Sequence, residues 1–151
     1  MASAHRCFVT LGLAALVACG GRRLVVGPAP ASPEATVGQF LAAVNANDHD
    51  RMAALYGDER GPSPNYFANS ARLDSVMTIL QHLLVTDSAR VTGTEPLLGK
   101  ATWRVLRMDL FHNGSVVAVP FTLAPQRAGG WLIADIDIMP LMPSVGRRSN
   151  P

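Results

Sequence analysis

Two aspartates near the C-terminal end of the sequence have a spacing that suits carboxylate chemistry. Asp135 and Asp137 alternate with Trp131 and Ile133, and side chains two residues apart share one face of a strand. One carboxylate of such a pair raises the pKa of the other, as general acid and base catalysis requires. The simpler interpretation is that both are solvated at the end of a strand face. Two carboxylates alone are also a poor set of metal ligands, so we expect no metal and no cofactor.

Histidine and serine chemistry has weaker support. His49, His82 and His112 stand singly in an inter-helix turn, a helix and a strand end, so a histidine site would have to be assembled by the fold. No serine has a nucleophile-elbow context, and the sequence contains no phosphate loop, zinc spacing or dinucleotide fingerprint. No catalytic residue is assigned.

Large aromatic side chains are better material for a binding pocket. An aromatic ring on the concave side of a curled sheet can enclose an apolar ligand and orient it with a hydroxyl or an indole N–H. The alternative is that each ring simply fills the core. The predicted ligand-binding residues are Tyr56, Trp103, Phe121, Trp131 and Asp135.

Helical patterns occupy the first half of the domain. Ser32, Pro33 and Glu34 are typical of a helix start, and an apolar stripe at i, i+3, i+4 and i+7 runs from Val37 to Val44. A second, shorter helix is predicted from Asp48 or Asp50 to the glycine at 57. Residues 61–64, rich in proline and glycine, are predicted to be a loop. A third helix is predicted to end near Leu84, and its buried side is predicted to carry Leu73, Val76, Met77, Leu80 and Leu84.

Alternating patterns follow, and they predict four strands over residues 89–94, 101–112, 115–124 and 131–139. The separators are Glu95-Pro96, Asn113-Gly114 and Gly129-Gly130. Asn-Gly is typical of a type I′ hairpin, which needs positive φ at both central positions. One face of the last strand is predicted to carry Leu132, Ala134, Ile136 and Ile138. The fold class is therefore α+β, with three N-terminal helices packed on a four-stranded antiparallel sheet.

The order of these elements, with four sequence segments, resembles the nuclear transport factor 2-like superfamily. The segments are 37–48 (VGQFLAAVNAND), 52–56 (MAALY), 119–123 (VPFTL) and 129–133 (GGWLI). The resemblance implies a curved, cone-like sheet and is strongest to small bacterial lipoproteins with a single such domain. It also implies homodimerisation through the open sheet face. Enzymes of the superfamily, such as ketosteroid isomerase, usually insert a strand pair between the second and third helices, and only about a dozen residues are available for one here.

The N-terminus predicts export and lipidation. An apolar run from Phe8 to Val17 is too short to span a bilayer and ends in Leu16-Val17-Ala18-Cys19, the pattern read by the bacterial lipoprotein peptidase. Ordinary secretory cleavage after Ala18, with Cys19 left as a free thiol, is the alternative. Lipidation is favoured because a mature chain with no second cysteine would otherwise carry an unpaired thiol in an oxidising compartment.

The predicted organisation is a signal peptide over 1–18, the lipidated Cys19 with a flexible tether over 19–33, the domain over 34–141 and a disordered tail over 142–151. Gly20 rather than aspartate follows the cysteine, which favours the outer membrane, facing the periplasm. The net charge is +2, and acidic and basic residues are dispersed along the sequence, so no basic patch for binding nucleic acid is visible.

The functional prediction is a lipid-anchored domain of the bacterial cell envelope. It is expected to bind a small apolar ligand or an envelope protein without catalysing a reaction. The alternative is a small enzyme of the isomerase or dehydratase type, with an aspartate inside the cone and Tyr56 as hydrogen-bond donor. An enzyme of this kind would need Asp109, Asp135 or Asp137 to be removed from solvent.

Overall fold

The computed structural model of the chain describes residues 28–142. They form three α-helices, a four-stranded antiparallel sheet and a second sheet of two short strands. The predicted α+β class and its element order are confirmed. The predicted signal peptide, Cys19, the tether up to residue 27 and the tail from residue 143 lie outside the described residues.

Each helix begins where a polar side chain caps its first turn. Helix α1 (Pro33–Asn45) follows Ser32, α2 (His49–Leu55) follows Asp48, and α3 (Ser70–Leu84) follows Asn69. In each case the capping oxygen accepts a hydrogen bond from a backbone N–H that the helix itself leaves free. Residues 28–142 thus contain three helices, as the α+β prediction requires.

A short strand pair forms between α2 and α3. Strands β1 (Gly57–Asp58) and β2 (Gly61–Pro62) are antiparallel, and the 3-10 helix η1 (Ser63–Asn65) follows them. The expectation of a plain loop here was wrong. Glycine makes the tight turn feasible, because Gly61 has a φ of +121° and a Cβ on Gly57 would overlap the carbonyl oxygen of Gly61.

The main sheet has the order β3-β4-β5-β6, with every pair antiparallel. Its strands are β3 (Ser88–Leu97), β4 (Lys100–His112), β5 (Ser115–Pro125) and β6 (Trp131–Ile136). Asn113 and Gly114 both have positive φ, as the hairpin prediction requires. The predicted turn at Glu95-Pro96 was wrong, because the chain turns at Leu98-Gly99 instead. Proline is tolerated in β3 because an edge strand does not need every N–H.

The predicted faces of the last strand were also wrong. The register shifts between Leu123 opposite Ile133 and Thr122 opposite Asp135, so Ala134 is an extra residue in β6. This bulge turns Ile136 to the same side as Ile133, and both are buried. Asp135 therefore does not share a face with Ile133, and β6 ends at Ile136 rather than at residue 139.

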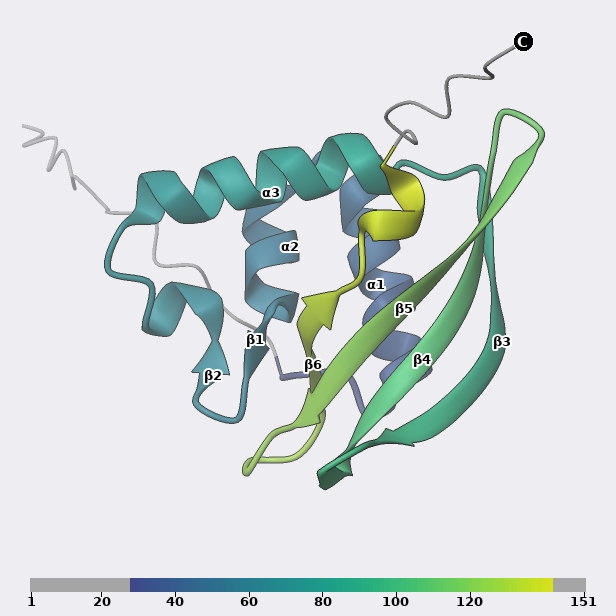
Figure 1. Cartoon of the computed structure of the whole chain (residues 1–151). Coiled ribbons are helices and arrows are strands. Elements are labelled where there is room, and N and C mark those ends of the chain that lie inside the picture. The colour runs from purple at the N-terminus through teal and green to yellow at the C-terminus, as the bar shows by residue number, and fades with distance from the viewer. Residues whose placement is uncertain (1–27, 143–151) are drawn as a thin grey trace, which may run out of the picture.

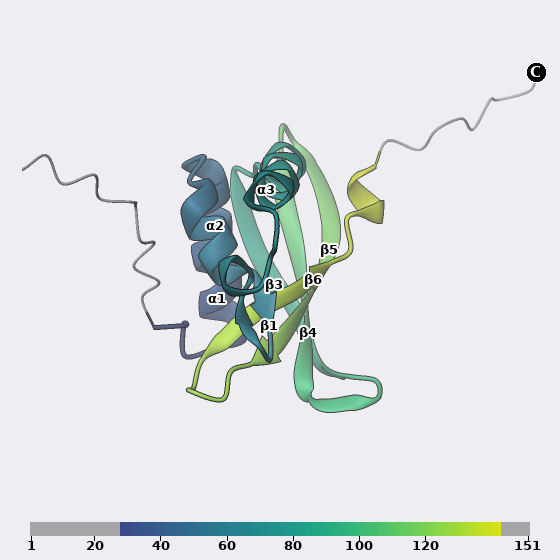
Figure 2. The ribbon, with the colours of Figure 1, turned by 90° about the vertical axis from the view of Figure 1, so that its left-hand side faces the viewer.

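The core lies between the inner face of the main sheet and the three helices. Figures 1 and 2 show α1 behind the curved strands and α3 running across one end of them. The largest fully buried side chains of the core include Phe40, Met52, Met77, Phe121 and Leu123. Strand β6 runs into the 3-10 helix η2 (Met139–Leu141) beside α3. The result is a groove between α3 and the end of β6.

Candidate functional site

The groove between α3 and β6 has a volume of about 360 Å³. Aliphatic side chains form most of its lining, and Tyr56 and Asp135 supply the polar groups. The lining residues are Tyr56, Val76, Ile79, Leu80, Asp135, Ile136 and Ile138. We call this site the Tyr56–Asp135 groove.

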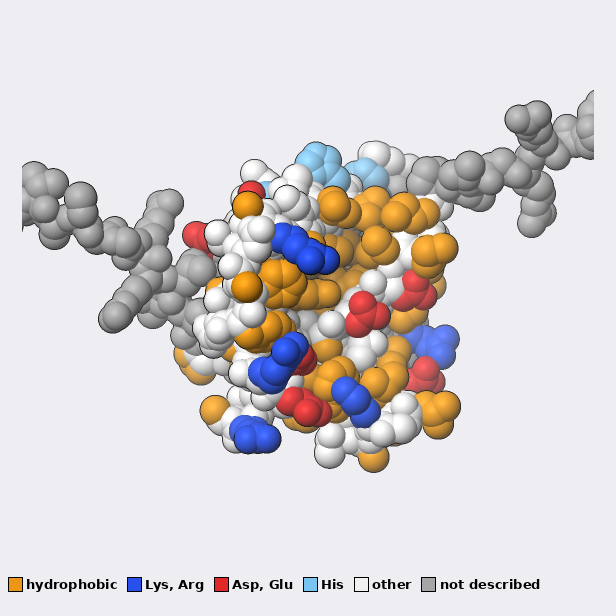
Figure 3. All heavy atoms as spheres, turned by 60° about the vertical axis from the view of Figure 1, so that its left-hand side comes forward, with side chains coloured by type: hydrophobic (Ala, Val, Ile, Leu, Met, Phe, Trp, Pro, Cys, Tyr) orange, Lys and Arg blue, Asp and Glu red, His pale blue; other side chains and the backbone are white. Residues whose placement is uncertain are grey.

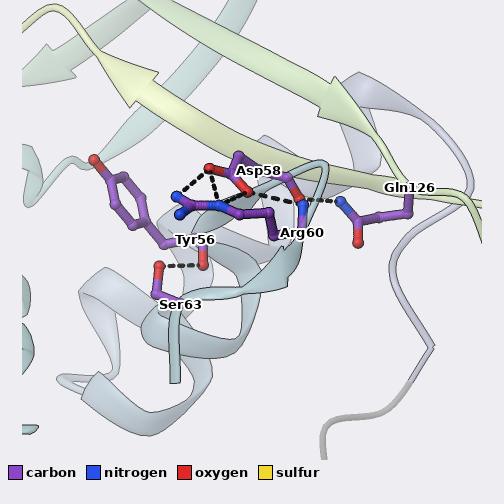
Figure 4. A network of polar contacts seen from close by, with 5 residues as sticks. All are labelled: Tyr56, Asp58, Arg60, Ser63 and Gln126. Atoms are coloured by element: carbon purple, nitrogen blue, oxygen red, sulfur yellow. Dashed lines mark hydrogen bonds and ion pairs between the residues drawn. The ribbon is translucent and has the colours of Figure 1, made fainter. Parts of the chain in front are cut away.

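The main chain holds Tyr56 firmly at the edge of this groove. Tyr56 ends α2 in an extended conformation and forms a parallel bridge to Ile133 of β6. Its carbonyl oxygen accepts hydrogen bonds from the hydroxyl of Ser63 at 2.6 Å and from the backbone N–H of Ser63 at 2.7 Å. Figure 4 shows the Tyr56 ring pointing away from the ion pair of Asp58 and Arg60.

The environment keeps the Tyr56 phenol protonated. Burial raises its pKa, and the negative charge of Asp135 and the proximity of Tyr66 raise it further. Among the described residues, none forms a hydrogen bond with the Tyr56 hydroxyl. The groove therefore presents a neutral O–H donor that is available to a ligand.

An ion pair lies within the β1–β2 hairpin, which directly follows Tyr56. The guanidinium of Arg60 lies 2.6 Å from Asp58 and 4.2 Å from the centre of the Tyr66 ring. Its hydrogen bonds to Asp58 hold the pKa of that carboxyl below its usual value. The side chain of Gln126 donates to the carbonyl oxygen of Asp58 at 2.6 Å, which ties the hairpin to the end of β5.

The wall formed by α3 exposes apolar surface. Ile79 is 54% exposed, and Val76 one turn before it is partly buried against the core. Figure 3 shows apolar side chains gathered in the upper half of this face, with charged side chains beside and below them. An apolar ligand in the groove would remove Ile79 from water.

The other predicted ligand residues lie elsewhere. Phe121 is fully buried in the core, and Trp131 packs at its margin, with its backbone N–H bound to Pro30. Trp103 is buried away from the core cluster, where its indole N–H donates to Glu59 and the ammonium group of Lys100 lies 3.4 Å from its ring centre. Of the five predicted residues, Tyr56 and Asp135 share the groove.

Sequence reasoning did not assign Ile79 and Ile138 to a ligand site. Ile79 falls outside the apolar stripe expected for its helix, and this misfit was the available signal. Ile138 was expected on a strand face, but it follows the end of β6 and leads into η2.

The aspartates that an enzyme would need are not buried. Asp135 and Asp137 are exposed, and Asp137 accepts a hydrogen bond from the backbone N–H of Met139. Asp109 is partly covered and forms an ion pair of 2.8 Å with Arg90. Each of the three carboxyl groups is therefore in contact with water or with a cation.

The fold brings two histidines to one pocket. His82 and His112 both line a pocket of about 300 Å³ between the end of α3 and the β4–β5 turn. His49 lies in another pocket, where its Nδ1 is 3.0 Å from Asp74 and its buried Nε2 has no hydrogen-bond partner. Within residues 28–142, no three side chains of histidine, cysteine or acid type are grouped to hold a metal ion.

No family model matches the chain, and no curated protein is significantly similar to it. None of the helices between residues 28 and 142 is both long enough and apolar enough to cross a membrane.

Proposed function

We propose that this chain is a lipid-anchored protein of the bacterial cell envelope that binds a small apolar molecule in the Tyr56–Asp135 groove without transforming it. The observation that carries the proposal is the combination of an aliphatic groove with a single protonated hydroxyl donor. A volume of about 360 Å³ is at the small end of the range for ligand pockets, about 300–1,000 Å³.

The polar groups narrow the class of ligand. The Tyr56 hydroxyl suits a hydrogen-bond acceptor such as a carbonyl or ether oxygen. The carboxylate of Asp135 lies at the same groove and would repel an anion, while it would tolerate a neutral or cationic group. The ligand class is therefore a small neutral or cationic amphiphile, and fatty acids are disfavoured.

The cone-like fold of the nuclear transport factor 2-like superfamily is part of the same proposal. The parallel bridge between Tyr56 and Ile133 supports it, because this bridge sets the β1–β2 hairpin, a separate small sheet, beside β6 of the curved sheet. In such a fold the groove would open at the mouth of the cone. Residues Leu16 to Cys19 support the lipid anchor.

Catalysis of the isomerase or dehydratase type is the weaker alternative. It needs a carboxyl group whose pKa is raised by removal from water. The exposure of Asp135 and Asp137 and the pairing of Asp109 with Arg90 favour binding instead.

The experiment that tests the proposal measures binding of two fluorescent probes of similar size. N-phenyl-1-naphthylamine is neutral, and 8-anilinonaphthalene-1-sulfonate is an anion. We expect the full chain, in detergent, to bind the neutral probe more tightly, and Asp135→Asn to reduce that preference. Ile79→Asp should weaken binding of the neutral probe about tenfold, because it places a charge on the apolar wall.

Val116→Asp is the matched control. Val116 is 53% exposed, almost the same as Ile79 at 54%, and it lies on β5 outside the groove. If both substitutions changed binding equally, or neither changed it, the groove would not be the binding site. Native mass spectrometry of the chain from its own envelope extract would then identify the bound molecule.

A further inference from the structure

Within the part of the chain that the structure describes, strand β3 forms a long free edge of the main sheet. It is the terminal strand in the order β3-β4-β5-β6, it spans 10 residues, and eight of those are exposed. Figure 1 shows β3 at the margin of the sheet, with no helix or strand of the described residues beyond it. A row of unpaired backbone groups of this length is a template for another strand.

Two opposite charges stand on the same face of this edge strand. Arg90 pairs with Asp109 of β4 at 2.8 Å, and Glu95 pairs with Arg107 of β4 at 2.7 Å. Residues five apart in a regular strand would point to opposite faces. The register shift at Thr92 removes this difference. Arg90 lies opposite Asp109, and Glu95 lies opposite Val105. Asp109 and Val105 are four residues apart on β4 and therefore share a face, so their partners on β3 share that face too.

The bulge therefore makes the edge self-complementary. In an antiparallel pair of two β3 strands with a two-fold axis between Thr92 and Gly93, Arg90 of each copy lies directly opposite Glu95 of the other. The axis makes the two contacts identical, as a closed dimer requires. Opposite charges directly across an antiparallel pair stabilise it. The charges that normally protect an edge strand from pairing would in this register favour it.

The inner face of the edge offers a second match. Val91 is 41% exposed and lines, with Ala89, a groove of about 420 Å³ beside Gly38 and Ala42 of α1. In the same register Val91 lies opposite Thr94 of the second copy, a pair of β-branched residues of the kind that packs well across strands. The second copy would thus cover apolar surface as well as backbone.

We propose that two copies of this chain associate through the free edges of β3, and form one continuous antiparallel sheet with Arg90 opposite Glu95 at two symmetric positions. This contact differs from the association through the open sheet face that the resemblance implies. It also leaves the Tyr56–Asp135 groove open, because β6 is at the opposite end of the strand order. The proposal is therefore independent of the ligand proposed above.

Sedimentation velocity of the full chain in detergent, with the detergent mass accounted for, tests this contact. We expect a dimer for the wild type. Arg90→Glu and Glu95→Arg should each weaken the dimer by about tenfold or more, because each replaces two attractive contacts with two repulsive ones. The double variant Arg90→Glu/Glu95→Arg should restore it.

The double variant separates the dimer contact from effects within one chain. It leaves both ion pairs to β4 broken, since an acid at position 90 would face Asp109 and a base at position 95 would face Arg107. Recovery of the dimer in that variant can therefore come only from contacts between copies. Circular dichroism of each variant checks that the chain remains folded.

Val116→Asp distinguishes the two modes of association. Val116 lies on an inner strand of the sheet, so a dimer through the β3 edge should tolerate the substitution. A wild-type monomer at 100 µM, about the upper range for a specific weak dimer, would overturn the proposal. A dimer that Val116→Asp disrupts and Arg90→Glu leaves intact would overturn it too, in favour of the sheet face.

Discussion

The hydroxyl of Ser63 donates a hydrogen bond of 2.6 Å to the main-chain carbonyl oxygen of Tyr56. The backbone N–H of Ser63 donates to the same oxygen at 2.7 Å, and the side chain of Ser63 is fully buried. These two bonds join the end of α2 to the start of η1 across the β1–β2 hairpin. They therefore fix the main-chain position from which the Tyr56 ring reaches the groove.

Replacement of Ser63 by alanine should destabilise the domain moderately. The carbonyl oxygen of Tyr56 keeps the backbone hydrogen bond, so the loss is that of one buried hydrogen bond, about 1 kcal/mol. Urea unfolding measures it. Ser75→Ala is the control, because Ser75 is exposed on α3 and bonds only to the carbonyl oxygen of Ala71. An equal loss in both variants would contradict the role assigned to Ser63.

Two glycine substitutions should act in opposite directions. Gly57→Ala should destabilise the domain by about 1–3 kcal/mol, because the new Cβ overlaps the backbone of Gly61 and Pro62. Gly38→Ala should stabilise it by up to about 1 kcal/mol, because Gly38 lies inside α1 with no atom within 4 Å of the new Cβ. Thermal and urea unfolding of the two variants give the comparison. A stable Gly57→Ala variant would show that the β1–β2 hairpin is not tightly packed.

Local sequence signals were sufficient for most of the fold. Capping residues marked the starts of the helices, and Asn113-Gly114 marked the β4–β5 turn, because these signals depend on a few neighbouring residues. Pro96 lies inside β3 and not at a turn, because proline, which marks a turn in most contexts, is tolerated in an edge strand. Whether a strand is at an edge depends on the whole sheet.

The groove was predictable only in part for the same reason. Tyr56 and Asp135 were chosen from residue type, and they do meet in one groove. Their meeting depends on the bulge at Ala134 and on the bridge from Tyr56 to Ile133, and neither has a local sequence signal. Phe121 was chosen on the same grounds but lies in the core, because its neighbours on β5 alternate regularly.

Replacement of Cys19 by serine should abolish lipid attachment. In the predicted anchor the sulfur of Cys19 would carry the lipid, so the variant should lose metabolic labelling with palmitate. It should also no longer be found in the Triton-extractable membrane fraction. Cys7→Ser is the control, because Cys7 lies within the predicted signal peptide. Labelling that persists in Cys19→Ser would refute the predicted anchor, while the groove and its ligand would stay open to test.

The raised pKa of Tyr56 gives a direct test of the groove's electrostatics. The sequence has two tyrosines, so Tyr66→Phe leaves Tyr56 as the only phenol that titrates at 295 nm. We expect it to titrate above the ordinary value of 10.0, with burial as the main cause. Asp135→Asn should lower this pKa, because it removes the second cause, but should leave it above 10.0. If Tyr56 titrated at its ordinary pKa, its ring would be solvated. If Asp135→Asn left the pKa of Tyr56 unchanged, the ring would lie far from the Asp135 carboxylate.

The same shift predicts how stability depends on pH. Below about pH 10 the phenol is protonated in both the folded and the unfolded chain, so Tyr56 adds no pH dependence there. Above that value the unfolded chain releases the proton first, and the folded chain does so only at its raised pKa. Wild-type stability should therefore fall relative to Tyr56→Phe as the pH rises from about 10 towards the folded pKa. Parallel urea titrations of the two proteins between pH 8 and 11, the range around the phenol pKa of about 10, measure this difference. If the two curves stayed parallel throughout, the folded and unfolded phenols would share one pKa, and the groove would lack the protonated donor on which ligand binding depends.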